Sequence, residues 1–540
     1  MGSGVDADRP PLRARAWSAL AYGLPLAFLG LFFLYPLAAI VERGLLAEGE
    51  RSALDVLADP LTREVVWFTV WQAVASTALT FAVALPATAV VGRYAFRGRR
   101  LVRSFVVVPF VLPTVVVALA FLALLPEPLE RGWAPILIAH AFFNVAVVVL
   151  VVGTFWAGID PRMGEAAATL GAGLWRRLRE VTLPTLAPAL SAAAAIVFLF
   201  SLTSFGVVLI LGGPRYSTLE VEIYNQAVRV YDLRAASVLA LVQLAFVAIA
   251  VWVALRLEAR LGVAGERRPE QDVLRRPRTA GERIAVWASL GGLGVFLGLP
   301  LAVLVERSLA VGDGHSLAAY RELVRPTAIL LVAPWEAIAN SALYAVSATL
   351  LAVVLGGLAA LAISSARGPR IVDGLLMLPL GASAVMLGLG FVIAFDTAPL
   401  DIRAEPWIVP VAQALVAIPF VVRIVVPTLR SIDERQREAA ALLGASPSRV
   451  RREIDVPVVS RGLAVAAGLA FAISLGEFGA TVFLARPDRP TLPVAIFRFL
   501  SRPGELNAAQ AYALAVVLMA VTALAVLAVE RVRLRRAGWL

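Results

Sequence analysis

The chain is 540 residues long, and 60% of its residues are hydrophobic whereas only 16% are charged. This apolar fraction exceeds what a water-soluble core requires, and it fits a bundle of membrane-spanning helices. The net charge of +11 reflects 49 basic residues, all of them arginine. The absence of cysteine excludes disulfides, thiolate metal sites and cysteine nucleophiles. Two histidines are too few for a histidine-based metal site unless carboxylates supply most of the ligands.

The first half of the chain contains six apolar segments that are long enough to cross a bilayer, which takes about 20 helical residues. They lie near residues 17–41, 65–91, 101–125, 134–156, 188–211 and 235–257. The first segment follows a polar stretch and lacks a small-residue cleavage site. We therefore expect it to be a retained span and not a removed signal peptide.

A polar stretch without an apolar run, RLEARLGVAGERRPEQDVLRRPRTAGER, covers residues 256–283 and predicts a solvated linker between two halves. Six further apolar segments follow it. They lie near residues 284–305, 336–364, 371–395, 407–429, 462–485 and 508–529. The sequence thus predicts an all-α integral membrane protein with twelve transmembrane helices.

The arginines indicate how the spans are oriented. With the N-terminus inside, the inner segments carry about 34 of the 49 arginines and the outer segments about 15. Arginine is retained on the cytoplasmic side during insertion, so both termini are expected in the cytoplasm. The loops after the fourth and tenth spans then face the cytoplasm too.

Those two loops carry almost the same phrase, EAAATLGA from Glu165 and EAAALLGA from Glu438. Placing residues 159–244 over residues 432–517 needs no gap and matches 34 of 86 positions. Within the membrane, SLTSFGVVLIL from Ser201 lies over SLGEFGATVFL from Ser474. Alanine-rich composition does not explain coincident Glu, Gly, Pro and Phe at one constant offset. The sequence therefore predicts an internal duplication, as many transporters have.

Each repeated loop has the pattern of two short helices joined at a glycine. In the first loop, residues 165–170 favour a helix, Gly171 interrupts it, and residues 174–181 resume it. Glycine tolerates positive φ, so Gly171 and Gly444 are expected to turn the chain sharply at positive φ. The small alanine face favours docking into a protein groove, and an amphipathic helix on anionic lipid is the alternative.

The pattern E-A-A-x-x-x-G in a cytoplasmic loop before the penultimate span of each half resembles the coupling loop of ABC importer permeases of the binding-protein-dependent type. The motif positions are Glu165, Ala166, Ala167 and Gly171, and again Glu438, Ala439, Ala440 and Gly444. The resemblance implies the type I importer permease fold, with two homologous six-helix halves fused in one chain of the bacterial inner membrane. It also implies that each loop sits in a cleft of one ATPase subunit.

The partners follow from the same resemblance. It implies two copies of an ABC ATPase on the cytoplasmic side, an extracytoplasmic substrate-binding protein, and the lipid bilayer, with no nucleic acid. The outer loops are candidate docking surfaces for the binding protein, and the alternative is that they only connect spans. The ATPase would use ATP and Mg, so no cofactor is expected in this chain. The expected domains are 1–64 (tail, first helix and outer loop), 65–258 (first permease domain), 259–283 (linker), 284–335 (seventh helix and outer loop), 336–531 (second permease domain) and 532–540 (tail).

The expected cargo depends on thinner similarity. ILIAHAFFN at Ile136 and the outer segment from Leu211 look most like the thiamine permease, and the ferric-iron permeases are the alternative. Thiamine carries a cationic ring, which a carboxylate or aromatic faces would favour in a low-dielectric pathway. Candidate residues of the translocation path are Ser201, Ser204, Phe205, Ser474, Glu477, Phe478 and His140.

Several of these candidates have a structural alternative. Glu477 falls within the predicted eleventh span and matches Ser204 of the first copy. It could equally be a hydrogen-bonded packing residue near Arg423 or the serines. His140 and Asn144, one turn apart, are favoured as interhelical hydrogen-bonding residues. The serines could serve close helix packing in the same way.

Two other classes of protein fit the sequence less well. A major-facilitator secondary transporter would also have twelve spans in two halves, but GRYAFRGRR at Gly92 lacks the aspartate of that family's loop. An ATPase needs a phosphate-binding loop with a lysine, and this chain has no lysine. We find no nucleophile and base for another membrane enzyme. The chain is therefore expected to be a transport subunit that draws its energy from a partner.

Overall fold

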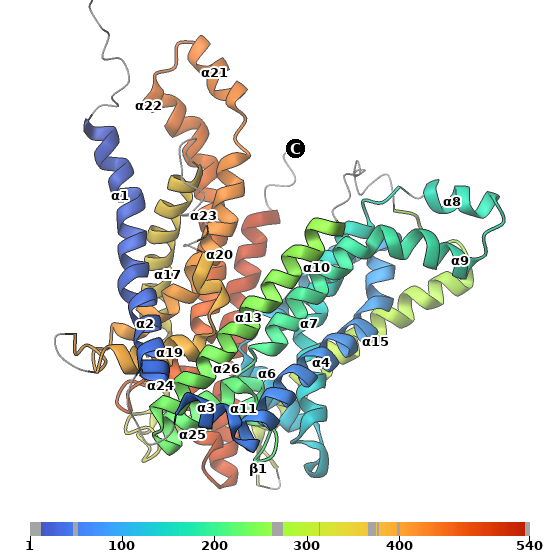
Figure 1. Cartoon of the computed structure of the whole chain (residues 1–540). Helices are drawn as coiled ribbons and strands as arrows, with labels where there is room; N and C mark the ends of the chain where they lie inside the picture. Colours follow the sequence, from blue (N-terminus) through green and yellow to red (C-terminus); the bar gives the residue numbers. More distant parts are fainter. Residues whose placement is uncertain are drawn as a thin grey trace, which may run out of the picture. The chain divides into compact units, whose positions relative to one another are not determined.

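The computed structural model describes residues 12–46, 52–160, 162–261, 274–312, 314–364, 374, 377–396 and 400–534. Figure 1 shows that this part of the chain is almost entirely helical. Its strands are the two-residue antiparallel pair β1 (Ala310–Val311) and β2 (Gly314–His315). The predicted all-α class is confirmed.

The chain forms two compact units. The large unit contains Val41–Ile338 and Pro487–Ala523, and the small unit contains Met1–Ile40, Ala339–Arg486 and Leu524–Leu540. The boundaries do not follow the chain order, because each unit combines separate segments. The predicted division into six domains stays a prediction.

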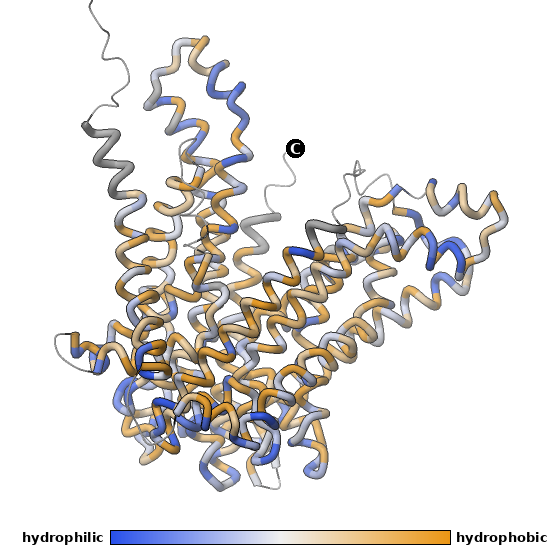
Figure 2. Tube along the Cα trace, viewed as in Figure 1, coloured by the Kyte–Doolittle hydropathy of each residue, from blue (hydrophilic) through white to orange (hydrophobic). Residues whose placement is uncertain are grey.

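Ten helices of the described residues are long and apolar enough to cross a membrane. They correspond to all the predicted spans except the third and the ninth. Figure 2 shows these helices as mainly hydrophobic tubes, with the hydrophilic residues gathered at their ends. The ninth predicted span, 371–395, lies partly outside the described residues, and its described part contains the short apolar helix α19 (Ala384–Ala394).

The large unit is formed mainly by the first half of the sequence. Its helical elements are η2 (Glu42–Leu46), α3 (Ala53–Ala58), α4 (Pro60–Arg93), α5 (Arg99–Val111), α6 (Thr114–Leu124), η3 (Glu127–Leu129), α7 (Trp133–Trp156), α8 (Arg162–Thr169), α9 (Leu174–Arg177), η4 (Leu178–Thr182), α10 (Leu183–Leu202), α11 (Gly206–Leu211), α12 (Leu219–Tyr224), η5 (Asn225–Val230), α13 (Leu233–Leu261), α15 (Ala280–Leu309), α16 (Ala318–Arg321), η6 (Glu322–Val324), α25 (Leu492–Leu500) and the first part of α26 (Glu505–Leu534).

The third predicted span, residues 101–125, is not one straight helix. It is the pair α5 and α6, bent by 98° at Leu112 and Pro113. Leu112 has extended backbone angles, as expected for a residue before proline, and Pro113 has no amide hydrogen to continue the helix. The predicted segment is therefore helical but broken, and hydropathy did not reveal the bend because the apolar run continues through it.

The small unit is formed mainly by the second half of the sequence. Its helical elements are α1 (Leu12–Leu29), η1 (Gly30–Leu34), α2 (Tyr35–Val41), α17 (Pro334–Ser364), η7 (Leu378–Gly381), α19, α20 (Ile408–Arg430), α21 (Glu434–Leu442), α22 (Pro447–Val450), η8 (Arg451–Asp455), α23 (Val456–Gly476), α24 (Thr481–Leu484) and the end of α26.

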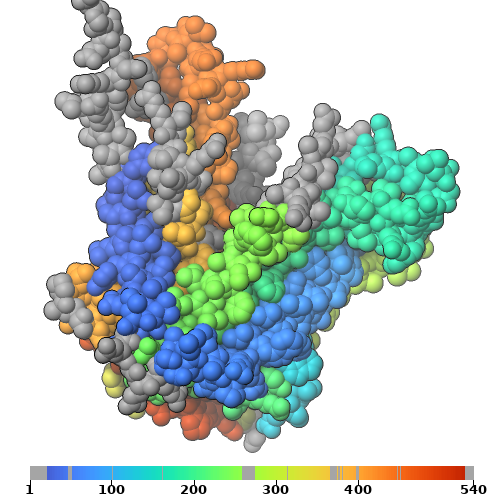
Figure 3. Space-filling model, in the orientation of Figure 1, coloured from blue at the N-terminus to red at the C-terminus, as the bar shows by residue number. Residues whose placement is uncertain are grey.

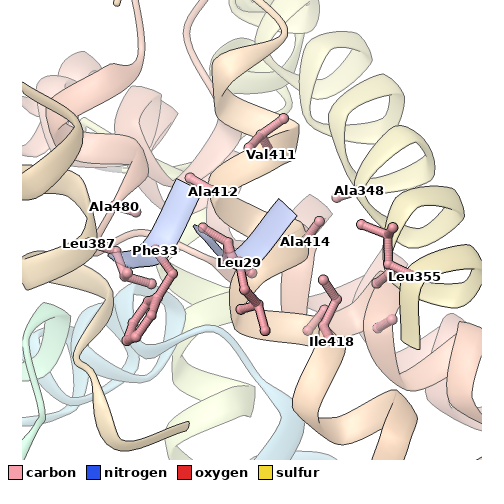
Figure 4. Packing of buried hydrophobic residues seen from close by; sticks show 14 of the residues in the cluster. Leu29, Phe33, Ala348, Leu355, Leu387, Val411, Ala412, Ala414, Ile418 and Ala480 are labelled. Carbon is pink, nitrogen blue, oxygen red and sulfur yellow. The ribbon is translucent and has the colours of Figure 1, made fainter. Parts of the chain in front are cut away.

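Each half of the sequence contributes its first helix to the unit formed mainly by the other half. The N-terminal helix (α1, η1 and α2) lies in the small unit, and α15 lies in the large unit. In the small unit, Leu29 and Phe33 of the N-terminal helix pack among buried residues of α17, α19 and α20 (Figure 4). The hydroxyl of Tyr22 also donates to the carbonyl of Ala362 at 2.7 Å. In the large unit, α15 packs against α6 and α4, and the rings of Phe296 and Phe142 lie 6.2 Å apart. The two halves of the sequence are therefore interlocked by exchange of their first helices.

The described end of the predicted linker is fixed to the large unit. Arg275 pairs through its backbone with the end of α4, and its guanidinium donates to Glu282 at 2.6 Å. The same guanidinium lies 4.9 Å from the ring of Tyr94. The hydrogen bond to Glu282 raises the pKa of Arg275 above its ordinary value. The linker therefore enters α15 from a defined position, although residues 262–273 lie outside the described part.

Candidate functional site

Both repeated loops form the predicted pair of short helices. In the first loop, α8 and α9 are separated by Gly171 at φ +81°, and in the second, α21 and α22 are separated by Gly444 at φ +80°. Positive φ at both glycines confirms the sequence-based expectation. A β-branched residue would be strained at either position.

The two turns also share their hydrogen bonds. The amide of Gly171 donates to the carbonyl of Ala168, and that of Ala172 to the carbonyl of Ala167, each at 3.0 Å. The same two bonds recur 273 residues later, from Gly444 and Ala445, again at 3.0 Å. This pair of bonds is the Schellman arrangement, which satisfies the last carbonyls of a helix. The two copies of the repeated phrase therefore form the same backbone turn.

The motif residues lie on the surface of these loops. Ala167 and Ala440 are half-buried, whereas the other motif positions are exposed. Beside them the loops expose large apolar side chains, including Leu170 at 88%, Trp175 at 73%, and Leu442 and Leu443 at 89% each. Figure 3 shows α8 and α9 as a projecting knob on the large unit, and α21 and α22 as one on the small unit. Exposed apolar tips of this kind are typical of interaction sites.

The loops differ in how their second helix is attached. Arg176 pairs with Glu180 at 2.9 Å in the first loop, and Arg449 pairs with Glu453 at 3.1 Å at the matching positions of the second. The second loop has an additional bridge, Arg437 to Asp455 at 2.9 Å, which joins α21 to η8. In the first copy, Gly164 and Thr182 occupy those two positions, so this bridge has no counterpart there.

The helix after each loop is interrupted where the two copies read SLTSFG and SLGEFG. The first, α10, ends at Leu202 before α11 begins at Gly206, and the second, α23, ends at Gly476 before α24 begins at Thr481. The predicted spans 188–211 and 462–485 were therefore wrong as continuous helices. A Cβ at Gly479 would lie 2.9 Å from that of Ala384, so the chain turns where α19 packs closely.

Glu477 lies in this interruption and not within a helix. Its two carboxylate oxygens accept hydrogen bonds from the amides of Ala480 at 2.7 Å and Thr481 at 3.0 Å. The carboxylate thus holds the first turn of α24, while Arg423 is exposed. This geometry matches the alternative of a hydrogen-bonded structural residue. Whether Glu477 also contacts cargo stays a prediction.

The remaining path candidates are buried. Phe205 lies 5.6 Å, centre to centre, from Tyr224, and Phe478 is 3% exposed. Among the described residues, the buried hydroxyl oxygens of Ser204 and Ser474 have no hydrogen-bond partner. Ser201, Ser204, Phe205 and His140 belong to the large unit, whereas Ser474, Glu477 and Phe478 belong to the small unit.

His140 and Asn144 form hydrogen bonds between helices of the large unit. The Nδ1 atom of His140 lies 2.9 Å from the hydroxyl of Ser76 in α4, and the amide nitrogen of Asn144 lies 3.4 Å from the hydroxyl of Ser201 in α10. Gln72 of α4 also donates to the carbonyl of Ser201 at 2.8 Å. These contacts agree with the favoured interhelical hydrogen bonding, and a role of His140 in the translocation path stays a prediction.

Sequence reasoning missed a second buried polar pair in the same unit. Glu220 in α12 is fully buried, and it accepts a hydrogen bond from Gln243 of α13 at 3.0 Å. Gln243 lies in the sixth predicted span and Gln72 in the second. A polar side chain in an apolar span is the signal that could have identified both glutamines.

Comparison with known proteins identifies the family. The model of the binding-protein-dependent transport system inner membrane component matches residues 84–263 and 352–536. The thiamine transport system permease protein ThiP of Brucella abortus is 30% identical over 95% of both chains. The probable ABC transporter permease protein y4fN of Sinorhizobium fredii is 25% identical over 94% of both. The putative 2-aminoethylphosphonate permease PhnV of Salmonella typhimurium is 32% identical over 45% of this chain and 91% of its own length.

The doubled match reproduces the internal repeat, and two of these relatives extend over both halves. The apolar spans agree with a component of the inner membrane. The chain therefore belongs to the binding-protein-dependent family of inner-membrane transport components, as a multi-pass permease subunit of an ABC importer.

Proposed function

We propose that this permease translocates thiamine or a phosphate ester of thiamine. The observation that carries this proposal is the similarity to ThiP, because it extends over 95% of both chains and therefore includes the outer segments as well as the coupling motif. PhnV, whose name specifies a different cargo, matches only 45% of this chain.

The two loops are proposed to transmit the conformational change of a separate ATPase. Their turns have the same hydrogen bonds and the same positive φ, and both expose leucines beside the motif. Two similar surfaces are suited to two copies of one partner. ATP binding would draw the two ATPase copies together and move both loops, and hydrolysis would reset them.

The loops are proposed to face the cytoplasm, and both chain termini with them. The arginine distribution supports this orientation. Within the large unit, α7 leads from the outer end at Trp133 to the inner end at Trp156, shortly before α8 begins. An extracytoplasmic binding protein would then deliver the cargo to the loops at the outer end.

Uptake of radiolabelled thiamine tests the cargo. A deletion strain should lose uptake and regain it when this gene is supplied with its ATPase and binding-protein partners. Ferric-iron uptake in the same strains is the matched control. Loss of iron uptake with normal thiamine uptake would overturn the assignment and favour the ferric-iron alternative.

A further inference from the structure

The large unit contains a pocket of about 640 Å³ at the end where α4 begins. Its walls come from the first turns of α4, the start of α7, and the chain from α11 to η5. Because α8 follows the other end of α7, the pocket and the first loop lie at opposite ends of this unit (Figure 1). The volume lies within the range of small-molecule sites.

Aromatic rings form one wall of the pocket. The rings of Phe68 and Trp71 are stacked with centres 5.9 Å apart, and Phe68 lies 5.2 Å from Tyr216. Trp71 meets Trp133 edge to face at 5.9 Å, and Trp67 also lines the pocket. Such rings offer faces to a flat aromatic ligand, and they attract a cation through their quadrupoles.

A carboxylate lies in the same wall. Glu222 in α12 is 8% exposed, and its oxygens accept hydrogen bonds from Gln226 at 2.7 Å and from Asn225 at 3.3 Å. These neutral amides fix the position of the carboxylate without cancelling its charge. The carboxylate therefore offers a negative group, fixed in position, to a cationic part of a ligand.

Arginines set a second requirement. Arg131, Arg215 and Arg229 line the pocket, against the two carboxylates of Glu64 and Glu222. A simple cation would meet an excess of positive charge, and a simple anion would meet Glu222 and the aromatic wall. A ligand that combines a cationic aromatic ring with an anionic group can contact the aromatic wall, Glu222 and the arginines at the same time. Guanidinium groups are well suited to phosphate.

Several residues that line the pocket have different counterparts in the second copy of the repeat. Its loop turns at Gly212 and Gly213, where a Cβ on Gly212 would collide with the carbonyl oxygen of Tyr216 and Gly213 has φ +65°. The second copy has alanine and arginine at the positions matching those two glycines. It also has Arg489 in place of Tyr216 and Ala495 in place of Glu222. The second copy therefore lacks the glycine turn and the Glu222 carboxylate that the first copy contributes to the pocket.

We propose that this pocket binds a small aromatic cation that carries an anionic group, as the importer's outer substrate site. If the proposed function holds, the phosphate ester of thiamine is the natural ligand, because its thiazolium ring is cationic and its phosphate is anionic. The aromatic wall and Glu222 bind the ring, and the arginines bind the phosphate. Unphosphorylated thiamine lacks the group that the arginines bind.

Calorimetry on the purified full-length permease in lipid nanodiscs tests this proposal with thiamine monophosphate, thiamine and inorganic phosphate as probes. Thiamine monophosphate should bind about tenfold or more tightly than thiamine, a difference of about 1.4 kcal/mol, and inorganic phosphate should not bind measurably. Glu222→Gln should weaken both thiamine compounds, with Glu306→Gln as a control outside the pocket. Arg215→Gln should abolish the preference for the phosphate ester, with the exposed Arg325→Gln as its control.

The outcomes separate this proposal from the proposed function. Wild-type binding by Glu222→Gln, Arg215→Gln and Trp71→Leu would overturn the site and leave the aromatic residues as part of a membrane-interface belt. Thiamine uptake by the complete importer without binding to the permease would also overturn the site, while the proposed cargo would stand. Binding with the expected losses but without uptake in cells would support the site and overturn the cargo.

Discussion

The two copies of the repeat are alike at the loops that contain Gly171 and Gly444 and different at their outer segments. The turns at Gly171 and Gly444 have the same φ within a degree and the same hydrogen bonds. At the outer segment, Glu222 and Tyr216 of the first copy are replaced by Ala495 and Arg489 of the second. A pair of identical ATPase subunits would demand the same surface twice, whereas one cargo molecule needs a site only once. This difference agrees with the proposal that the loops transmit the conformational change and that the outer segment of the first copy binds the cargo.

The largest effect is expected where the two copies agree most closely. Replacing Gly171 or Gly444 with valine puts a β-branched side chain at positive φ, with a strain on the order of 1–3 kcal/mol in an exposed loop. Membrane insertion should survive, because the spans are separate from that turn. Uptake should fall below a tenth of the wild-type rate for either variant in reconstituted vesicles.

A control for this substitution exists in the same loop. Gly164 lies within α8, a Cβ there would have open space, and its φ is not positive. Gly164→Ala should therefore transport at the wild-type rate. If Gly171→Val and Gly444→Val do so as well, the loops do not transmit the conformational change.

A smaller effect is expected where the copies differ within the interrupted helices. Glu477→Gln places an amide donor opposite the backbone amide of Ala480 or Thr481, because only one acceptor oxygen remains. The loss of this hydrogen bond should destabilise the turn by about 1–3 kcal/mol and reduce uptake several-fold. Ser204→Ala, at the matching position, removes a hydroxyl without a partner in the described structure and should be near neutral.

Thermal unfolding measured beside uptake distinguishes the two roles of Glu477. Reduced uptake with reduced stability supports the structural role seen in its hydrogen bonds. Reduced uptake at unchanged stability would instead indicate direct contact with cargo, as the sequence suggested. A variant with unchanged stability and unchanged uptake would contradict both roles.

The bridge between Arg437 and Asp455 allows a weaker test of loop asymmetry. Both side chains are partly exposed, so Arg437→Gln should cost below about 1 kcal/mol. ATPase association, measured by co-purification, should weaken slightly through the second loop. An effect as large as that of Gly444→Val would contradict this ranking, because the turn and not the bridge is proposed to set the shape of the loop.

The smallest effect is expected for the ion pair that both loops share. The side chains of Arg176 and Glu180 are 70% and 58% exposed, and those of Arg449 and Glu453 are similar. Exposed pairs four residues apart on a helix contribute about 0.3–0.5 kcal/mol. Arg176→Gln and Arg449→Gln should therefore have equal, small effects on thermal stability. A large difference between them would show that the matched loops have unequal surroundings.

Local features of the sequence predicted the turns at Gly171 and Gly444 well. A glycine after a short helical run predicts positive φ because other residues are strained there, and both glycines conform. The breaks after Leu202 and Gly476 were missed because hydropathy continues across them, and at the second break the chain packs closely against α19 through Gly479. The exchange of the first helices and the pocket at Glu222 depend on contacts between residues far apart in the chain. Periodicity and hydropathy contain no information about such contacts.

The central claim is that the two loops dock on two copies of one ATPase subunit. The chain has no cysteine, so a single introduced cysteine can be labelled specifically, and this allows the most direct measurement. Leu170 and Leu443 occupy matching positions in the two loops, with exposed fractions of 88% and 89%. Leu170→Cys and Leu443→Cys, each labelled with a thiol-reactive photocrosslinker in the assembled importer, should both form adducts with the ATPase subunit. Leu129→Cys, which is 57% exposed before α7, should not. Adducts from neither loop, or from Leu129→Cys to the same extent, would contradict the account.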